Sequence, residues 1–224
     1  MNTTIYYNDI GSGEPIVLIH GSLSYGQETF NRQIDPFSRH YRCLCPDLPG
    51  HGRSKDIANN WTTATLAEEI YLWLNEIGIK KAHMVGHSMG GDIVMYLMLY
   101  HGELVRSAVS ISSAGMVNDS IADFLYQLQS RDDPNRENCF LKRMIWNCTH
   151  YPDFSDEDLQ NMKAPFLLIR GKQDPMVKDS EVQRLQNLIP HFSCEEFEGS
   201  HFLQGSRKSA NAINECILGF TNSY

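Results

Sequence analysis

The chain has 224 residues, of which 42% are apolar and 21% are charged, an ordinary composition for a single globular domain with a sizeable core. The formal net charge of −8, with no cluster of lysines and arginines, argues against binding to nucleic acid. The N-terminus has neither a basic start nor an apolar signal segment, and no stretch has the roughly 18 uninterrupted apolar residues of a membrane helix. We therefore expect a cytoplasmic protein with no membrane partner.

Short apolar runs alternate with longer amphipathic stretches, a pattern typical of β-α-β units and a parallel sheet. The predicted strands, in chain order, cover residues 4–7, 16–20, 41–46, 82–86, 105–111, 165–170 and 194–197. The predicted helices cover residues 30–37, 66–77, 90–98, 181–188 and 210–220. The order predicts an α/β fold with a mostly parallel, doubly wound sheet.

The longest amphipathic segment carries signals for both of its ends. Thr65 and Glu68 have the spacing of a capping box, and Gly78 is suited to ending a helix. We therefore predict a helix that begins near Thr65 and stops at Gly78.

A gap of roughly fifty residues between the strands at 105–111 and 165–170 is too long for a bare loop. Apolar residues inside it recur at helical spacing, so residues 116–164 are predicted to form a small helical lid inserted before the penultimate strand. Residues 1–115 and 165–224 would then form the core domain. Five large side chains of the lid could line a substrate pocket or could simply pack the lid, and their helical spacing does not distinguish these two interpretations. These residues are Phe124, Leu125, Phe140, Met144 and Trp146.

The strongest local motif is Gly86-His87-Ser88-Met89-Gly90, between a predicted strand and a predicted helix. Such a turn strains the serine backbone and exposes its hydroxyl, while the flanking glycines allow close approach of neighbouring chain. The next backbone N–H, that of Met89, opens the helix, where negative charge is favoured. This pattern indicates a nucleophilic serine; the alternative is a glycine-rich turn that contains an incidental serine.

His201 and Asp174 are the candidates for the base and the acid that a nucleophilic serine requires. Each follows one of the last two predicted strands, so both should lie at the carboxyl edge of the sheet, where Ser88 also lies. Asp174 would orient the imidazole and stabilise its charged form. The alternatives are a surface or core histidine and a turn aspartate before Pro175.

The order Ser88, Asp174, His201 resembles that of the α/β-hydrolase fold enzymes. His20-Gly21-Ser22 is similar to the oxyanion loop of that family, which implies that the Ser22 N–H joins that of Met89. The segment from Asp47 to Ser54 is similar to a second, structural signature loop. One departure is that the chain starts at what is usually the second strand, so the sheet is expected to lack one edge strand.

The resemblance implies a serine hydrolase that cleaves a small carboxylic ester, lactone or thioester through an acyl-enzyme on Ser88. Two alternatives stay open: a ligand sensor that retains the triad, and an acyltransferase or cyclase that excludes water. We expect a small-molecule acyl substrate, no cofactor and no metal, with a monomer or homodimer as the assembly. His20, His51 and His87 are expected to be structural, and Asp92 an ordinary helix residue.

Overall fold

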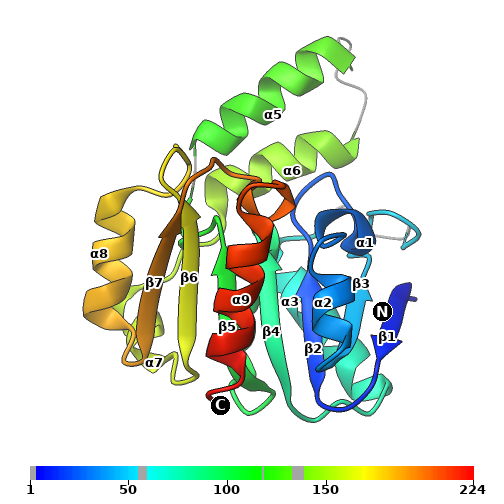
Figure 1. Cartoon of the computed structure of the whole chain (residues 1–224). Coiled ribbons are helices and arrows are strands. Elements are labelled where there is room, and N and C mark those ends of the chain that lie inside the picture. The colour runs from blue at the N-terminus through cyan, green and yellow to red at the C-terminus, as the bar shows by residue number, and fades with distance from the viewer. Residues whose placement is uncertain (1–3, 55–59, 118, 133–138) are drawn as a thin grey trace.

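The computed structural model describes residues 4–54, 60–117, 119–132 and 139–224. In this part of the chain, seven strands form one sheet in the order β1-β3-β2-β4-β5-β6-β7 (Figure 1). Their bounds are Tyr7–Gly11 (β1), Pro15–Ile19 (β2), Arg42–Pro46 (β3), Ala82–His87 (β4), Val105–Ile111 (β5), Phe166–Gly171 (β6) and Phe192–Phe197 (β7). Neighbouring strands are parallel except β1 and β3, which are antiparallel. The mostly parallel sheet predicted from the sequence is confirmed.

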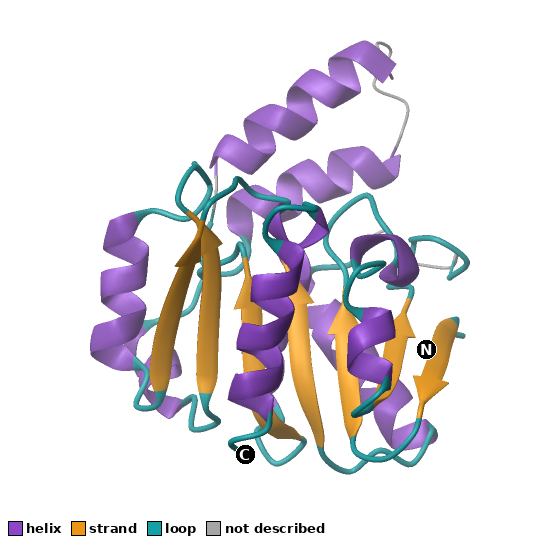
Figure 2. Ribbon diagram, in the orientation of Figure 1, coloured by secondary structure: helices purple, strands orange, loops and turns teal. Residues whose placement is uncertain are grey.

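Helices cover both faces of the sheet (Figure 2). In Figure 1, α2 and α9 lie in front of the sheet and α3 lies behind it, where it packs against α4. The helices of these layers and their ends are α1 (Gly26–Thr29), α2 (Ile34–Ser38), α3 (Thr63–Glu76), α4 (Met89–Tyr100), α8 (Asp179–Leu188), the short 3₁₀ turn η1 (Leu203–Gly205) and α9 (Ala210–Thr221). Because helices cover both faces of the sheet, the sequences of the central strands are continuous apolar runs.

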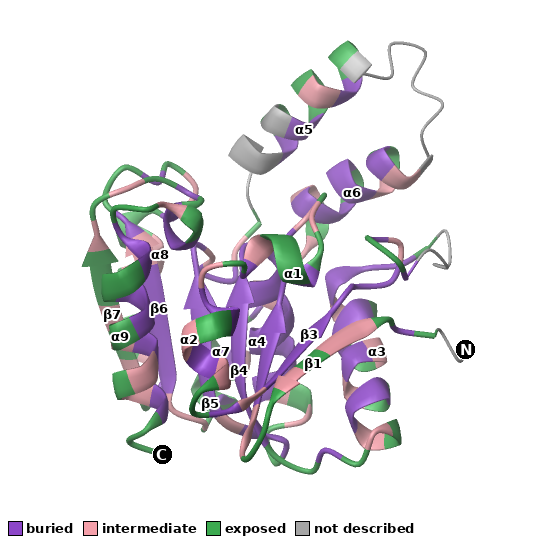
Figure 3. Cartoon of the chain, turned by 45° about the vertical axis from the view of Figure 1, so that its right-hand side comes forward, coloured by how far each residue is buried: buried purple, intermediate pink, exposed green. Residues whose placement is uncertain are grey.

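Strand β2 shows how the two layers share the sheet. Ile16 and Leu18 point into one apolar cluster, and Val17 and Ile19 point into the other. All four side chains are fully buried. Figure 3 shows the same burial along the central strands. Because successive side chains alternate between faces, a strand covered on both sides must be apolar throughout.

The edge strand differs from its prediction. The sequence predicted a strand at residues 4–7, whereas β1 runs from Tyr7 to Gly11 and pairs with β3 over its whole length. Asp9 on β1 forms a salt bridge with Arg42 on β3, with 2.7 Å between Oδ2 and Nη2. This polar segment forms a strand because it pairs with β3. The strand was predicted from apolar runs, and an apolar run does not indicate which polar segment will pair with a neighbouring strand.

The start of α3 also differs from its prediction. Thr62, not Thr65, is the N-cap, and Thr65 is its partner in the capping box. Glu68 contacts His101 instead, with 2.8 Å between Oε2 and Nε2. The same threonine-rich stretch offers two caps three residues apart, so sequence spacing alone placed the cap one turn too late. Gly78, at φ 79°, follows the end of the helix as predicted.

The segment between β5 and β6 contributes three helices: α5 (Asp119–Asp132), α6 (Cys139–His150) and α7 (Asp156–Asn161). In Figure 1, α5 and α6 lie together beyond the carboxyl edge of the sheet, and α7 lies at the opposite end, near α8. Asn147 ties α6 to the start of α3: its Oδ1 accepts from the Thr63 N–H at 2.8 Å, and its Nδ2 donates to the Thr63 hydroxyl at 2.7 Å. The lid assignment of residues 116–164 stays a prediction. Of the three helices described in that range, α5 and α6 lie beyond this edge and α7 does not.

Candidate active site

Ser88 lies at the sharp turn between β4 and α4. Its backbone has φ 53° and ψ −124°, a conformation that non-glycine residues rarely adopt. A Cβ at Gly86 would collide with the carbonyl of Gly90, and a Cβ at Gly90 would collide with the carbonyl of Ile19. The glycines on both sides of the serine therefore permit a turn that no larger residue would fit.

His201 lies in the loop after β7, and its ring reaches Ser88. The Ser88 hydroxyl donates to Nε2 of His201 across 2.9 Å. His87, next to the serine, donates from its own Nε2 to the backbone carbonyl of His201 at 2.9 Å. Burial lowers the pKa of His87 to about 3, so this residue is a neutral donor that fixes the His201 loop.

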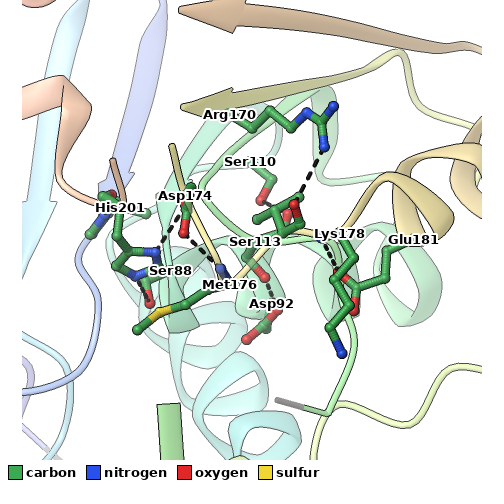
Figure 4. Close-up of polar contacts among 12 residues, drawn as sticks. Ser88, Asp92, Ser110, Ser113, Arg170, Asp174, Met176, Lys178, Glu181 and His201 are labelled. Carbon is green, nitrogen blue, oxygen red and sulfur yellow. Dashed lines mark hydrogen bonds and ion pairs between the residues drawn. The ribbon is translucent and has the colours of Figure 1, made fainter. Parts of the chain in front are cut away.

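Asp174 completes the arrangement from the loop after β6 (Figure 4). Its Oδ2 accepts from Nδ1 of His201 at 3.1 Å, and its Oδ1 accepts from the Met176 N–H at 2.9 Å. Burial by itself would raise the pKa of this fully buried carboxyl group, but the hydrogen bond and charge interaction with His201 and the Met176 N–H lower it below its usual range. The structure thus brings together the three side chains that the sequence singled out.

Ser22 and Met89 lie beside Ser88, as the predicted oxyanion pair requires. They line one cavity together with Ser88, and a Cβ placed on Gly21 would lie 3.0 Å from the Ser88 Cβ. Met89 is the first residue of α4, so its N–H has no acceptor within the helix. This end of the helix favours negative charge on an oxygen bound near the serine.

Two loops support this edge of the sheet through buried polar groups. His20 accepts from the Leu48 N–H through Nε2 at 2.8 Å and donates from Nδ1 to the Gly21 carbonyl at 2.7 Å. Burial lowers its pKa to about 3, which makes it a neutral linker between the two loops. Asp47 accepts from the backbone N–H of Gly26 at 3.2 Å and of Arg53 at 3.0 Å.

Two small cavities lie beside Ser88, each of about 20 Å³, enough for roughly one water molecule. The first is lined by Ser22, Ser88, Met89, Asp92, Met116, Asn147, Cys148 and Tyr151. The second is lined by Ser88, Asp92, Ser112, Ser113, Ala114, Met116, Met176 and Glu181. Residues of α6 and of the loop after β5 therefore close the space above the serine.

The predicted pocket residues are placed elsewhere. Leu125 and Met144 are buried in the apolar core, and the Phe140 ring packs against His51 at 5.0 Å between centroids. Trp146 lines a separate cleft, and the side chain of Phe124 lies outside the described residues. None of the four described side chains lines either cavity at Ser88. Helical spacing marked apolar positions that pack into the core, against His51 or at a separate cleft, and not positions that face the serine.

Asp92 was expected to be an ordinary helix residue, but it lines both cavities. The Ser113 hydroxyl donates to its Oδ1. Burial raises its pKa to about 7, although the contacts with Ser113 and the Gly115 N–H act in the opposite direction. The available signal was the position of an acidic residue four places after Ser88, in a helix that is otherwise apolar around most of its circumference.

Within the described residues, no group of three or more His, Cys, Asp or Glu side chains is arranged to hold a metal ion. A membrane-spanning helix is likewise not found in the portion of the chain that the structure covers.

Comparison with known proteins identifies the family. The model of the alpha/beta hydrolase fold family matches residues 14–140, which is more than half of the chain. The chain is 28% identical, over 96% of its length and 90% of the relative, to a 2-hydroxy-6-oxononadienedioate/2-hydroxy-6-oxononatrienedioate hydrolase of Paraburkholderia phymatum.

Solved structures show the same fold. A meta-cleavage product hydrolase from Pseudomonas fluorescens superposes with a TM-score of 0.77, at 23% identity, and the match covers 98% of this chain and 94% of that one. An enol-lactonase from Burkholderia xenovorans superposes with a TM-score of 0.76, at 20% identity, over 97% of this chain and 96% of that one. Because the family model matches more than half of its residues, and because these solved structures share its fold, the chain belongs to the α/β-hydrolase fold family.

Proposed function

We propose that the protein is a serine hydrolase that cleaves a small carboxylic ester, lactone or thioester through an acyl-enzyme on Ser88. The observation that carries the proposal is the continuous chain of hydrogen bonds from the Ser88 hydroxyl through His201 to Asp174, at 2.9 Å and 3.1 Å. A nucleophile, a base and an orienting carboxylate in this order are the parts that acyl transfer needs.

In the first step, the Ser88 oxygen bonds to the substrate carbonyl carbon while Nε2 of His201 takes the hydroxyl proton. The carbonyl oxygen becomes negative and is received by the N–H groups of Ser22 and Met89. When the carbonyl re-forms, the leaving oxygen or sulfur departs with the proton held by His201. Asp174 keeps the ring in the tautomer that this transfer requires and stabilises its charged form.

In the second step, water takes the place of the leaving group. His201 removes a proton from the water as its oxygen bonds to the acyl carbon, and the Ser88 oxygen is then released and reprotonated. The products are a carboxylic acid and the free enzyme.

The similarity to 2-hydroxy-6-oxononadienedioate hydrolase supports a second candidate, hydrolysis of a carbon–carbon bond next to a ketone. The same serine, base and N–H groups would serve, but the leaving group would be a carbon that must be protonated. An N-acyl homoserine lactone degrading enzyme of the same fold, at 24% identity and a TM-score of 0.78, keeps the lactone within the first proposal.

The test is a panel of short aryl esters, lactones, thioesters and a 2-hydroxy-6-oxodienoate, assayed with wild type and Ser88→Ala. We expect Ser88→Ala to lower kcat by roughly 10⁴- to 10⁶-fold on the true substrate class. Ser180→Ala, on the exposed side of α8, is the matched control and should leave kcat unchanged. Equal activity of wild type and Ser88→Ala would overturn the proposal. Products formed only with an added alcohol or amine would instead indicate an acyltransferase.

A further inference from the structure

Asp92 has an unusual position for a carboxyl group. It lies one helical turn after Ser88, so the two side chains share a side of α4 at the helix start. The side chain lies deep in the protein, yet part of it remains accessible, and the residue lines both cavities at Ser88. Its accessible surface therefore opens toward the space that a substrate would occupy.

The loop after β5 holds Asp92 in this position (Figure 4). The Ser113 hydroxyl donates to Oδ1, and the Ser113 oxygen itself accepts from the Gly115 N–H at 3.3 Å. The Ser110 hydroxyl donates to the Ser113 carbonyl at 2.6 Å. These hydrogen bonds hold the carboxyl group between the end of β5 and the two cavities.

The charges around the two cavities have one sign. Glu181 on α8 lines the second cavity, and among the described residues lining either cavity there is no lysine or arginine. The guanidinium of Arg184 contacts Met116 from outside, but it is paired with Asp156 at 2.7 Å and with the Phe154 carbonyl at 2.8 Å. A carboxylate placed beside Ser88 would therefore meet negative charge and no free cation from the lining.

Resting on the proposed role of Ser88, we propose that Asp92 determines specificity by excluding substrates that carry a carboxylate at the end of the acyl group. The substrate is then uncharged or cationic at that end. This distinguishes the chain from the relative whose name describes a dicarboxylate. Like charges in a water-poor cavity repel strongly enough to change relative rates by roughly tenfold or more.

The ionisation of Asp92 sets the conditions of the test. Its pKa is raised to about 7, first by burial and also by the negative charge of Glu181. Among the described residues, other titratable groups near it are Tyr96 on its own helix, Cys148 on α6 and Tyr151, which lines the first cavity. Burial raises the pKa of Tyr96, and it raises the pKa of Cys148 to about 12. At pH 8.5 Asp92 is therefore mostly a carboxylate, while Tyr96 and Cys148 stay neutral.

The experiment compares three 4-nitrophenyl esters of similar length at pH 8.5: the pentanoate, the glutarate monoester and the 4-trimethylammoniobutanoate. For wild type we expect kcat/KM for the glutarate to fall at least tenfold below that for the pentanoate. Asp92→Asn should raise the glutarate-to-pentanoate ratio roughly tenfold and lower the trimethylammonium-to-pentanoate ratio. Glu103→Gln is the control, because it removes one negative charge from an exposed residue before β5. It should leave both ratios as in wild type.

Unchanged ratios in Asp92→Asn would overturn the inference, because a purely structural role would lower all three rates together. If Asp92→Asn does not fold, Glu181→Gln should shift the ratios in the same direction by a smaller factor, and its failure to do so also counts against the inference.

If wild type cleaves none of the esters, the proposed function fails for esters, and the charge preference is measured by binding. Dissociation constants of pentanamide, pentylammonium and pentanoate are then compared by calorimetry in wild type and Asp92→Asn. Weakest binding of pentanoate in wild type, relieved in the variant, supports the inference. The inference is overturned if the ratios of the three dissociation constants are the same in wild type and Asp92→Asn, or if none of the three ligands binds.

Discussion

Two carboxyl groups lie near Ser88, and they have opposite pKa shifts. Asp174, in the loop after β6, has a lowered pKa, whereas Asp92, at the start of α4, has a pKa raised to about 7. Burial acts in the same direction on both, since it disfavours the charged form. The difference comes from their partners: His201 and a backbone N–H outweigh burial at Asp174, whereas a serine hydroxyl and one N–H do not at Asp92.

This comparison separates two uses of a buried acid. A carboxylate that must stay charged is paired with the ring that it orients, as Asp174 is with His201. A carboxyl group with only neutral partners can change its charge near neutral pH, as Asp92 can. The first suits catalysis at constant charge, and the second suits selection among substrates.

Of the changes that test this comparison, removing the charge at Asp174 is expected to have the largest effect. Asp174→Asn should lower kcat by roughly 10⁴-fold, because an amide can hold the His201 ring in the wrong tautomer. The measurement is kcat on whichever substrate of the panel is cleaved. Asp179→Asn, on an exposed side chain of α8, is the control and should stay within twofold of wild type. A loss smaller than tenfold in Asp174→Asn would show that Asp174 does not orient the base.

An intermediate effect is expected at His87, which holds the His201 loop from the other side. His87→Phe removes the donor to the His201 carbonyl and should lower kcat about tenfold, since a lost buried hydrogen bond costs about 1–3 kcal/mol. KM should change little, because His87 lines neither cavity at Ser88. His87→Gln keeps a donor and should recover part of the loss. If both variants lose activity equally, the hydrogen bond is not what matters.

The smallest effect concerns stability and its dependence on pH. The folded pKa of Asp92, about 7, lies above its ordinary value of 3.8, so the folded state holds a proton that the unfolded state releases between these values. Stability is thus lost as pH rises through this window. Asp92→Asn should raise Tm at pH 8 by a few degrees, since about 1 kcal/mol corresponds to about 2–4 °C in a domain of this size.

The same measurement at low pH gives the control for that stability prediction. At pH 4 wild-type Asp92 is protonated in the folded state, so the gain in Tm from Asp92→Asn should nearly vanish. Asp174→Asn should show the opposite pH dependence. The lowered pKa of Asp174 stabilises the folded state at pH values above the ordinary pKa of an aspartate, and this stabilisation is lost as pH falls through the lowered pKa of the folded state. Parallel pH profiles for the two variants would contradict the opposite shifts.

The sequence predicted the fold class, most strands and the three polar residues at the carboxyl edge. The central strands are apolar because both faces are covered, and that pattern is local. The Gly-x-Ser-x-Gly turn is local as well, since steric demands fall on residues within a few positions of Ser88. The edge strand β1 was misplaced because its pairing with β3 determines where it runs. The cap of α3 was misplaced because Thr62 and Thr65 are both suited to cap a helix, and the local sequence does not distinguish them.

What the sequence by itself determined is therefore the layered α/β architecture and the strand ends after which Ser88, Asp174 and His201 occur. Only the tertiary structure decided which side chains close over the serine. Asn147, Cys148 and Tyr151 line that space, while the larger residues of α5 and α6 pack elsewhere. Helical periodicity reports which side of a helix is apolar, but not which neighbour that side meets, and the environment of Asp92 depends on four segments that are distant in sequence.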